Sequence, residues 1–161
     1  MSRKRISRED MFSQIVQVIA QRSTCLRYQV GALIVRDGRI VSMGYNGPVS
    51  GRPECTSPLS LQDLEQLHHY TKATECEGPG CTRSLHAETN AIAFAAKAGV
   101  SVDGCTLYCS LSPCINCAKV IVNSGIKEVK FLKKYRNEEG IRFLLASCID
   151  VVDLGGTEDD E

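Results

Sequence analysis

Histidine, glutamate and cysteine residues in the second half of the chain have the spacing of a metal site that activates water. His86 and Glu88 stand in His-Ala-Glu, and Cys114 and Cys117 stand in Pro-Cys-Ile-Asn-Cys. One imidazole and two thiolates give tetrahedral Zn²⁺ three ligands and leave its fourth position for water, as in catalytic zinc sites. Glu88, which is not needed as a ligand, is suited to take the proton of that water. The spacing therefore predicts a hydrolytic zinc centre.

Each of these residues also has an ordinary structural explanation. An isolated Cys-x-x-Cys is often structural zinc, and a glutamate in the first turn of a helix compensates the helix dipole. The conjunction is more specific, because His-x-Glu with Pro-Cys-x-x-Cys is the signature of zinc-dependent nucleobase deaminases. The alternative from another class is a zinc-stapled binding module without chemistry, which would have no use for Glu88.

The composition is that of a folded protein in a reducing compartment. The chain has 161 residues, of which 43% are hydrophobic and 24% charged, so we expect a single domain over residues 1–161 with a disordered acidic tail at 155–161. Nine cysteines, an odd number, favour thiolate metal ligands over disulfides. The net charge of zero gives no attraction for nucleic acid or anionic membranes. We expect a cytoplasmic protein without nucleic acid or membrane partners.

Hydrophobic periodicity predicts alternating helices and strands. An apolar stripe after Ser7 predicts a helix over 7–22, and Asp37-Gly38 predicts a tight turn between strands 30–36 and 39–43. Glycine and proline predict a loop from 44 to 60. The remaining expected elements are a weak helix at 60–72, a turn at 77–80, helices at 86–98, 113–124 and 137–147, and strands at 105–110, 127–132 and 148–154. The pattern predicts an α/β fold with helices on both faces of a mixed sheet.

Two of these helices begin at the candidate zinc ligands. His86 opens one and the segment from Pro113 opens the other, with Pro113 suited to the first helical position because its missing N–H needs no partner there. In an alternating fold of this kind the two helix starts can meet over one point at an edge of the sheet. Their dipoles would favour the thiolate forms of Cys114 and Cys117.

Several segments resemble the deoxycytidylate (dCMP) deaminases of the cytidine deaminase superfamily, and the likeness covers almost the whole chain. The segments that carry it are Val30-Gly-Ala-Leu-Ile-Val35, Gly44-Tyr-Asn-Gly47, His86-Ala-Glu-Thr-Asn-Ala-Ile92, Leu111-Ser-Pro-Cys-Ile-Asn-Cys-Ala-Lys119 and Ser124-Gly-Ile-Lys-Glu-Val129. The resemblance implies a three-layer α/β/α cytidine-deaminase-like fold with a mixed sheet of about five strands. It also implies hydrolysis of dCMP to dUMP and ammonia, which supplies thymidylate synthesis.

The resemblance and the residue chemistry together suggest how a nucleotide would be held. Glu88 would carry a proton from the attacking water to N3 of the base and then to the departing amine. By resemblance Asn46 would hold the deoxyribose. Backbone groups are expected at the base, with the N–H of Ala87 at the O2 carbonyl and Ser110 and Leu111 at the amino edge. Arg27 and Tyr135 are the candidates for the phosphate.

Four further cysteines suggest a second zinc. In some enzymes of the resembling family a structural zinc has ligands at the positions of Cys25, Cys55 and Cys76, with a carboxylate just before the catalytic histidine. Here Ser84 replaces that carboxylate, and Cys81 would complete a site of four thiolates. The alternative is that these are free cysteines in the core. The remaining three, Cys105, Cys109 and Cys148, lie on predicted strands, where we expect core packing.

The resemblance also implies regulation and assembly. Relatives are commonly homo-oligomers, often hexamers, that dCTP activates and dTTP inhibits, and Mg²⁺ would accompany such a triphosphate. The matching positions are Gly44 and Gly47 in the loop 44–51, Phe94 and Lys97. Pro48 directly after Gly47 departs from the family pattern, which puts the shape of the effector loop in doubt. Deamination of dCTP or of a tRNA base is the alternative within enzymes, since those relatives share the zinc motifs.

Overall fold

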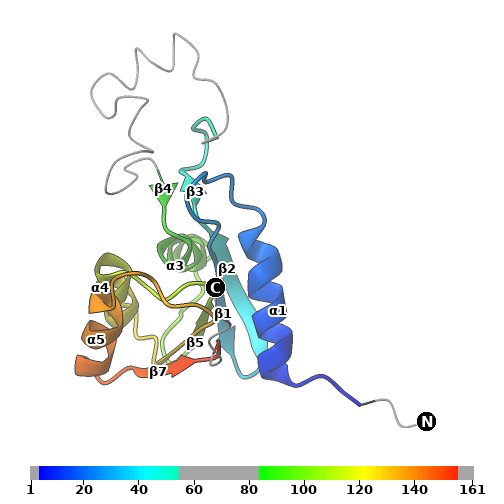
Figure 1. Cartoon of the computed structure of the whole chain (residues 1–161), viewed down its shortest axis with the longest axis vertical. Coiled ribbons are helices and arrows are strands. Elements are labelled where there is room, and N and C mark those ends of the chain that lie inside the picture. Colours follow the sequence, from blue (N-terminus) through cyan, green and yellow to red (C-terminus); the bar gives the residue numbers. More distant parts are fainter. Residues whose placement is uncertain (1–3, 55–83, 156–161) are drawn as a thin grey trace.

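A five-stranded sheet forms the centre of the computed structural model of this chain, which describes residues 4–54 and 84–155 (Figure 1). The helices and strands follow one another as α1 (Arg8–Ala20), β1 (Gly31–Arg36), β2 (Arg39–Tyr45), β3 (Gly47–Pro48), β4 (Ser84–Leu85), α3 (Ala87–Lys97), β5 (Thr106–Cys109), α4 (Ile115–Asn123), β6 (Glu128–Phe131), α5 (Glu139–Ala146) and β7 (Asp150–Asp153). The expected helix 60–72, the turn 77–80, Cys55, Cys76, Cys81 and the acidic tail lie outside the described residues.

The sheet is mixed, as the sequence predicted. Its strand order is β2-β1-β5-β6-β7, in which β1 is antiparallel to both β2 and β5, whereas β5, β6 and β7 are parallel. Helices α4 and α5 connect the parallel strands, because parallel neighbours need a crossover. Strands β3 and β4 form a separate two-stranded ladder.

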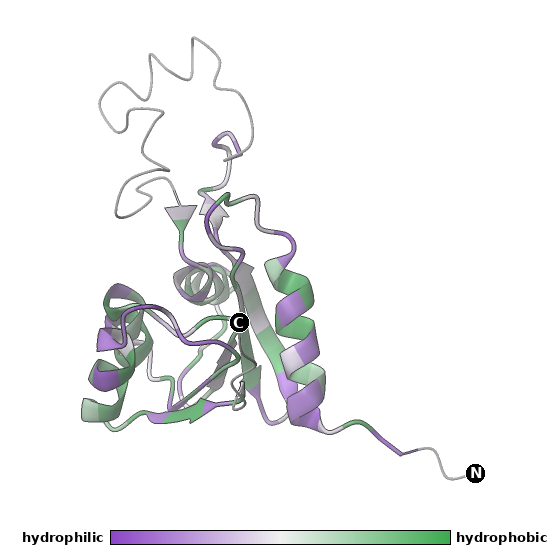
Figure 2. Cartoon of the chain, in the orientation of Figure 1, coloured by the Kyte–Doolittle hydropathy of each residue, from purple (hydrophilic) through white to green (hydrophobic). Residues whose placement is uncertain are grey.

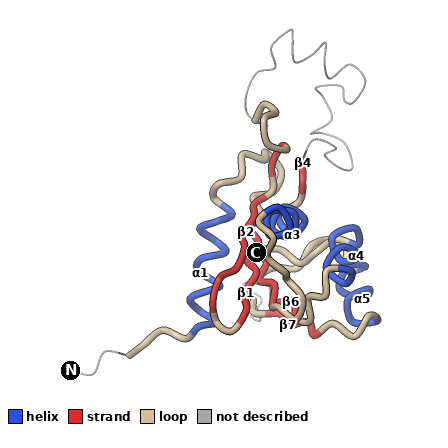
Figure 3. Tube along the Cα trace, turned by 180° about the vertical axis from the view of Figure 1, so that it is seen from behind, coloured by secondary structure: helices blue, strands red, loops and turns tan. Residues whose placement is uncertain are grey.

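Helices cover both faces of the sheet and bury two apolar clusters. On one face, α1 packs its buried Phe12 and Val16 against Leu33 and Tyr108 of the sheet. The opposite cluster includes Ile34, whose neighbours come from α3, α4 and α5. Alternate residues of β1 thus face opposite layers, which is the period of a strand. Figure 3 shows α1 and the pair α4 and α5 on opposite sides of the strands. The three-layer α/β/α prediction is confirmed.

The helix cap and the tight turn that the sequence predicted near the start of the chain are both present. The hydroxyl oxygen of Ser7 accepts a hydrogen bond of 2.9 Å from the backbone N–H of Asp10 and so caps α1. In Figure 2 this helix carries both hydrophobic and hydrophilic residues, as expected for a helix that packs only one of its sides against the sheet. Asp37 and Gly38 both have positive φ, at 50° and 72°, which gives the tight turn between β1 and β2.

Three local predictions are wrong. Strand β2 continues through Gly44 to Tyr45, so the loop does not begin at residue 44. Helix α4 begins at Ile115 with Cys114 as its N-cap, so Pro113 precedes the helix. Cys148 is exposed because it lies in the turn before β7 and not in the strand, and its φ there is 59°. The predicted core positions of Cys105 and Cys109 are confirmed.

None of the helices in the described part of the chain is long and apolar enough to cross a membrane.

Candidate active site

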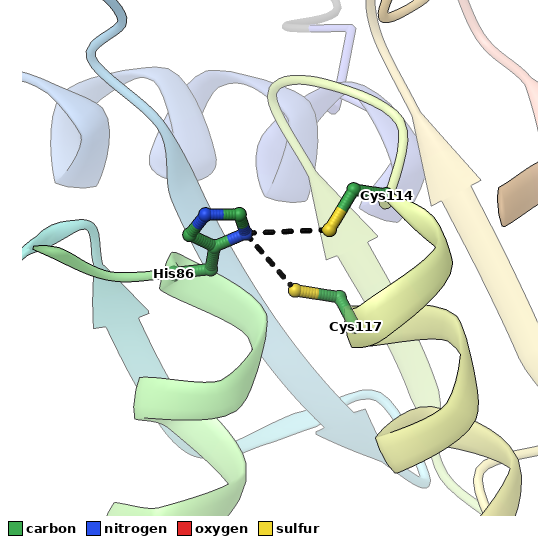
Figure 4. Close-up of side chains that lie close together, drawn as sticks. All are labelled: His86, Cys114 and Cys117. Atoms are coloured by element: carbon green, nitrogen blue, oxygen red, sulfur yellow. Dashed lines mark hydrogen bonds between the residues drawn. The ribbon is translucent and has the colours of Figure 1, made fainter. Parts of the chain in front are cut away.

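The residues at the starts of α3 and α4 form the candidate site. His86 is the N-cap of α3 and Cys114 is the N-cap of α4, each with extended backbone angles that precede the helical ones. Cys117 follows Cys114 by nearly one helical turn, so both thiols lie on the same side of the helix start. In Figure 4 the imidazole and the two thiols point toward one another from the two helices.

The three donor atoms are close enough to hold one metal ion. The Nδ1 of His86 lies 3.4 Å from the Sγ of Cys114 and 3.3 Å from the Sγ of Cys117 (Figure 4). Ligand atoms from all three residues lie within 4.8 Å of one another. Metal–nitrogen bonds of about 2.0 Å and metal–sulfur bonds of about 2.3 Å fit between atoms at such separations. One nitrogen and two sulfurs are donors that suit zinc, and the residues present therefore fit this ion.

The two thiols interact with each other and with His86, and these contacts shift their pKa values. A hydrogen bond with Cys117 and further interactions with His86 lower the pKa of Cys114 to about 3, against the opposing effect of partial burial. The same hydrogen bond and burial raise the pKa of Cys117. The hydroxyl of Thr89, one turn into α3, lies 3.8 Å from the Cys117 sulfur. Both sulfurs bind a metal ion as thiolates, so metal binding displaces whatever proton the pair holds.

Glu88 is a buried carboxyl beside these donors. Only 4% of the residue is exposed, although it belongs to the first turn of α3. Burial raises the pKa of Glu88, while a backbone hydrogen bond, the charge of His86 and a hydrogen bond with the Cys117 side chain act in the opposite direction. A carboxyl whose pKa is raised in this way takes up a proton more readily than an exposed carboxylate does, which suits a group that accepts and releases protons. Its geometry fits the proton-transfer role expected from the sequence.

A pocket of about 380 Å³ opens in front of the donors. Its lining comes from the loop before β1, from the segment after β2, and from the starts of α3 and α4. The sequence-predicted residues that line it are Cys25, Arg27, Asn46, His86, Ala87, Glu88, Leu111, Cys114 and Tyr135. The arrangement gives a small molecule access to His86, Cys114 and Glu88 together, while Cys117 is buried behind the lining.

Other predicted residues lie away from this lining. Ser110 faces an adjacent pocket, and its N–H and hydroxyl bond to the backbone of Gly31, each at 3.0 Å. Gly44 is buried beneath α3, so it cannot present its backbone to a phosphate. Gly47 is buried in β3, while Phe94 and Lys97 are exposed on α3.

Five further lining residues were not expected from the sequence: Tyr28, Val30, Ser84, Ser112 and Asn116. Tyr28 and Tyr135 lie edge to face with ring centroids 6.0 Å apart. The amide of Asn46 accepts a hydrogen bond from the N–H of Val30 and donates one to the carbonyl oxygen of Tyr28, both at 2.8 Å. Tyr28 could have been predicted as a lining residue because it directly follows Arg27, a phosphate candidate. Nothing in the sequence around Ser112 indicated that it contacts Tyr135.

Comparison with known proteins agrees with this geometry. Residues 6–133 match the family described as the cytidine and deoxycytidylate deaminase zinc-binding region. The deoxycytidylate deaminase of Enterobacteria phage T4 is 36% identical over 152 residues, which cover 79% of each chain. ComE operon protein 2 of Bacillus subtilis is 38% identical over 133 residues, covering 83% of this chain and 63% of that protein.

A solved structure shares the fold over nearly its whole length. The dCMP deaminase of cyanophage S-TIM5, crystallised in complex with dCMP and dUMP, aligns with a TM-score of 0.76 and 30% identity over 94% of this chain and all of that one. The chain belongs to the cytidine and deoxycytidylate deaminase family. It is an enzyme of the deaminase class, and the description of its family names a zinc-binding region. The cluster of His86, Cys114 and Cys117 could hold such an ion.

Proposed function

We propose that this enzyme hydrolyses dCMP to dUMP and ammonia and so supplies dUMP for thymidylate synthesis. The observation that carries the proposal is the buried Glu88 carboxyl beside the three metal donors, in the lining of a pocket of about 380 Å³. A pocket of this volume suits a mononucleotide. The cyanophage relative, which has been crystallised with dCMP and dUMP, supports this choice of substrate.

His86, Cys114 and Cys117 would hold the catalytic zinc. When bound, zinc supplies an acidified water as the nucleophile. Two thiolate ligands neutralise the charge of the ion, so its bound water would be less acidic than in an all-histidine site. A neighbouring base is then needed to take the proton of that water. Glu88 meets that need because it is close to the donors without being required as a ligand.

Glu88 would act as base and then as acid. It takes one proton from the attacking water and delivers it to N3 of the cytosine as the oxygen bonds to C4. It then passes the second proton of that oxygen to the amino group, which leaves as ammonia as the C4–N bond breaks. One water is consumed, and no oxidant or reductant is needed. The burial that raises the pKa of Glu88 favours this exchange of protons.

Backbone groups and one amide would orient the base and the sugar. The N–H of Ala87, in the first turn of α3, is suited to the O2 carbonyl, and Leu111 lines the pocket where the amino edge would lie. Ser110 could act there only through its carbonyl, because its N–H bonds to Gly31. The Asn46 amide retains one N–H beyond its bonds to the 28–30 segment, and this donor would serve the deoxyribose.

Arg27 and Tyr135 would bind the 5′-phosphate. Both line the pocket, and the guanidinium of the neighbouring Arg136 lies 5.6 Å from the centroid of the Tyr135 ring. A guanidinium and a phenol are strong donors to phosphate oxygens. A monophosphate can therefore use donors of the pocket that a nucleoside, which has no phosphate, would not reach.

A second, structural zinc would be held by Cys25, Cys55, Cys76 and Cys81. Cys25 is half-buried, and the hydroxyl of its neighbour Thr24 donates a hydrogen bond to the carboxylate of Glu54. That contact joins the residues preceding Cys25 and Cys55, which supports a shared site. Four thiolates would close the coordination sphere and give a structural ion.

Regulation by dCTP and dTTP, with Mg²⁺ on the triphosphate, is proposed at the segment around Gly47, Phe94 and Lys97. Phe94 is 60% exposed and Lys97 is exposed on the same helix, as an effector site or a subunit contact requires. Gly44 contributes by supporting α3, since it is buried there. We propose a homo-oligomer, with a hexamer favoured by the resemblance, in the cytoplasm.

Ammonia release from a panel of substrates tests the proposed activity. The panel contains dCMP, dCTP, CMP, deoxycytidine and a deaminable tRNA. Preference for dCMP by kcat/KM supports the proposal, and preference for dCTP or for the tRNA would assign the enzyme to one of the alternatives. Absence of ammonia from all of them would favour a binding module.

A further inference from the structure

Ser112 is a buried hydroxyl that fixes the backbone of the segment carrying Tyr135. The Ser112 oxygen accepts a hydrogen bond of 2.8 Å from the N–H of Tyr135, and the N–H of Ser112 donates one of 2.8 Å to the carbonyl oxygen of Lys133. Only 3% of Ser112 is exposed. Breaking a buried hydrogen bond costs free energy because it leaves a polar group without a partner. The two bonds therefore hold the backbone of residues 133–135 against Ser112.

The segment held by Ser112 meets a second segment that is held in the same way. Asn46, 7% exposed, bonds to the backbone on both sides of Gln29 and so fixes the position of Tyr28. The two tyrosine rings then contact each other at an interplanar angle of 75°. Edge-to-face contact of this kind is favourable between aromatic rings. Both tyrosines line the pocket, so the pair forms an aromatic wall, defined here as Tyr28 and Tyr135.

We infer that Ser112 is a positioning residue that sets substrate affinity by holding Tyr135 in the aromatic wall. The inference rests on the proposed function, since it concerns how the nucleotide is held in that pocket. Ser112 acts at the Tyr135 backbone, while the metal donors and Glu88 lie at the starts of α3 and α4. Loss of the Ser112 hydroxyl therefore weakens nucleotide binding and leaves the proton transfers in place.

Steady-state kinetics with dCMP separate these effects. Ser112→Ala is expected to raise KM about 5- to 30-fold with kcat within about twofold of wild type. Ser112→Thr, which keeps the hydroxyl, should restore most of the affinity. In a Tyr135→Ala background the same Ser112→Ala change should alter KM by less than about twofold, because the residue through which it acts is gone. An undiminished effect in that background would overturn the inference.

The matched control is Ser42→Ala. Ser42 is also buried, at 5% exposure, and its hydroxyl donates a hydrogen bond of 2.7 Å to the carbonyl oxygen of Ala91. Its loss should lower Tm by an amount similar to Ser112→Ala without raising KM. An equal rise in KM for both variants would mean that Ser112 acts only through general stability.

Amide hydrogen exchange tests the geometry without any activity. The Tyr135 amide should exchange slowly in the wild-type protein and at least about tenfold faster in Ser112→Ala, while Ser42→Ala leaves it unchanged. Fast exchange in the wild type would overturn the inference whatever the kinetics, and even if Ser112→Ala did not fold. Protection of this amide in a protein that deaminates no member of the substrate panel would instead contradict the proposed function.

Discussion

Gly44 in β2 lies directly beneath the first turn of α3, so close to Ala87 that a methyl group at Gly44 would come within 2.5 Å of the Ala87 carbonyl oxygen. The same methyl group would lie 2.5 Å from the backbone nitrogen of Ala91. Ala87 stands between His86 and Glu88, and its carbonyl belongs to the turn that carries both. The strand therefore supports the candidate site through backbone contact that only glycine permits.

Gly44→Ala is expected to destabilise the protein by about 1 to 3 kcal/mol, because α3 has to move away from β2 to admit the new methyl group. Gly47→Ala is the matched control, since no atom of the described residues lies within 4 Å of a methyl group at that position. Its free energy of unfolding should stay within about 0.5 kcal/mol of wild type. Urea unfolding measures both, and equal stability of the two variants would contradict the close approach.

The hairpin and the metal cluster were predictable from the sequence for different reasons. Asp37-Gly38 specifies its turn locally, through backbone angles. His86, Cys114 and Cys117 are far apart along the chain, but few structures other than a zinc centre need those residue types at that spacing. Glu88 followed from the same chemistry, because a water held by two thiolates and a histidine requires a base.

Residues whose roles depend on tertiary contact were not predictable. Gly44 was expected to approach a phosphate, but its lack of a side chain serves contact with α3 instead. Nothing local to Ser112 shows that it meets Tyr135, because that hydrogen bond joins different loops. Cys148 was expected in the core, and it is exposed because its turn precedes the last strand. Such contacts are fixed only when the layers pack.

Cys114→Ser and Cys117→Ser should each lose the catalytic zinc, because both sulfurs are donors of the same cluster. Metal analysis of the purified variants should give one zinc per chain less than wild type, together with loss of deamination. Cys148→Ser provides the control, as this thiol is exposed and lies outside the cluster. Retention of full zinc content by Cys114→Ser would contradict the assigned ligands.

A wild-type preparation should contain two zinc ions per chain. Cys25→Ser should remove the structural ion, lower the thermal stability and leave the ion at His86 in place, because the two ligand sets share no residue. Anomalous scattering at the zinc edge counts and locates both ions. A single ion in the wild type would leave Cys25 as an ordinary lining residue of the pocket.

The effector site should respond to nucleoside triphosphates with Mg²⁺. We expect dCTP to lower, and dTTP to raise, the dCMP concentration at half-saturation by a factor of about 5 to 150, the usual range of allosteric coupling. Lys97→Ala should reduce both effects by removing a cation from the exposed side of α3, whereas Lys127→Ala, exposed before β6, should not. Superimposable saturation curves would contradict this regulation.

Conversion of dCMP to dUMP by the wild type and by zinc-loaded Glu88→Gln, measured side by side with the zinc content of each, tests the central claim most directly. Glutamine keeps the size of the side chain but cannot exchange a proton, so we expect full zinc occupancy and a loss of kcat of about 10² to 10⁴. Turnover by Glu88→Gln at the wild-type rate, or failure of the zinc-loaded wild type to form dUMP, would contradict the account.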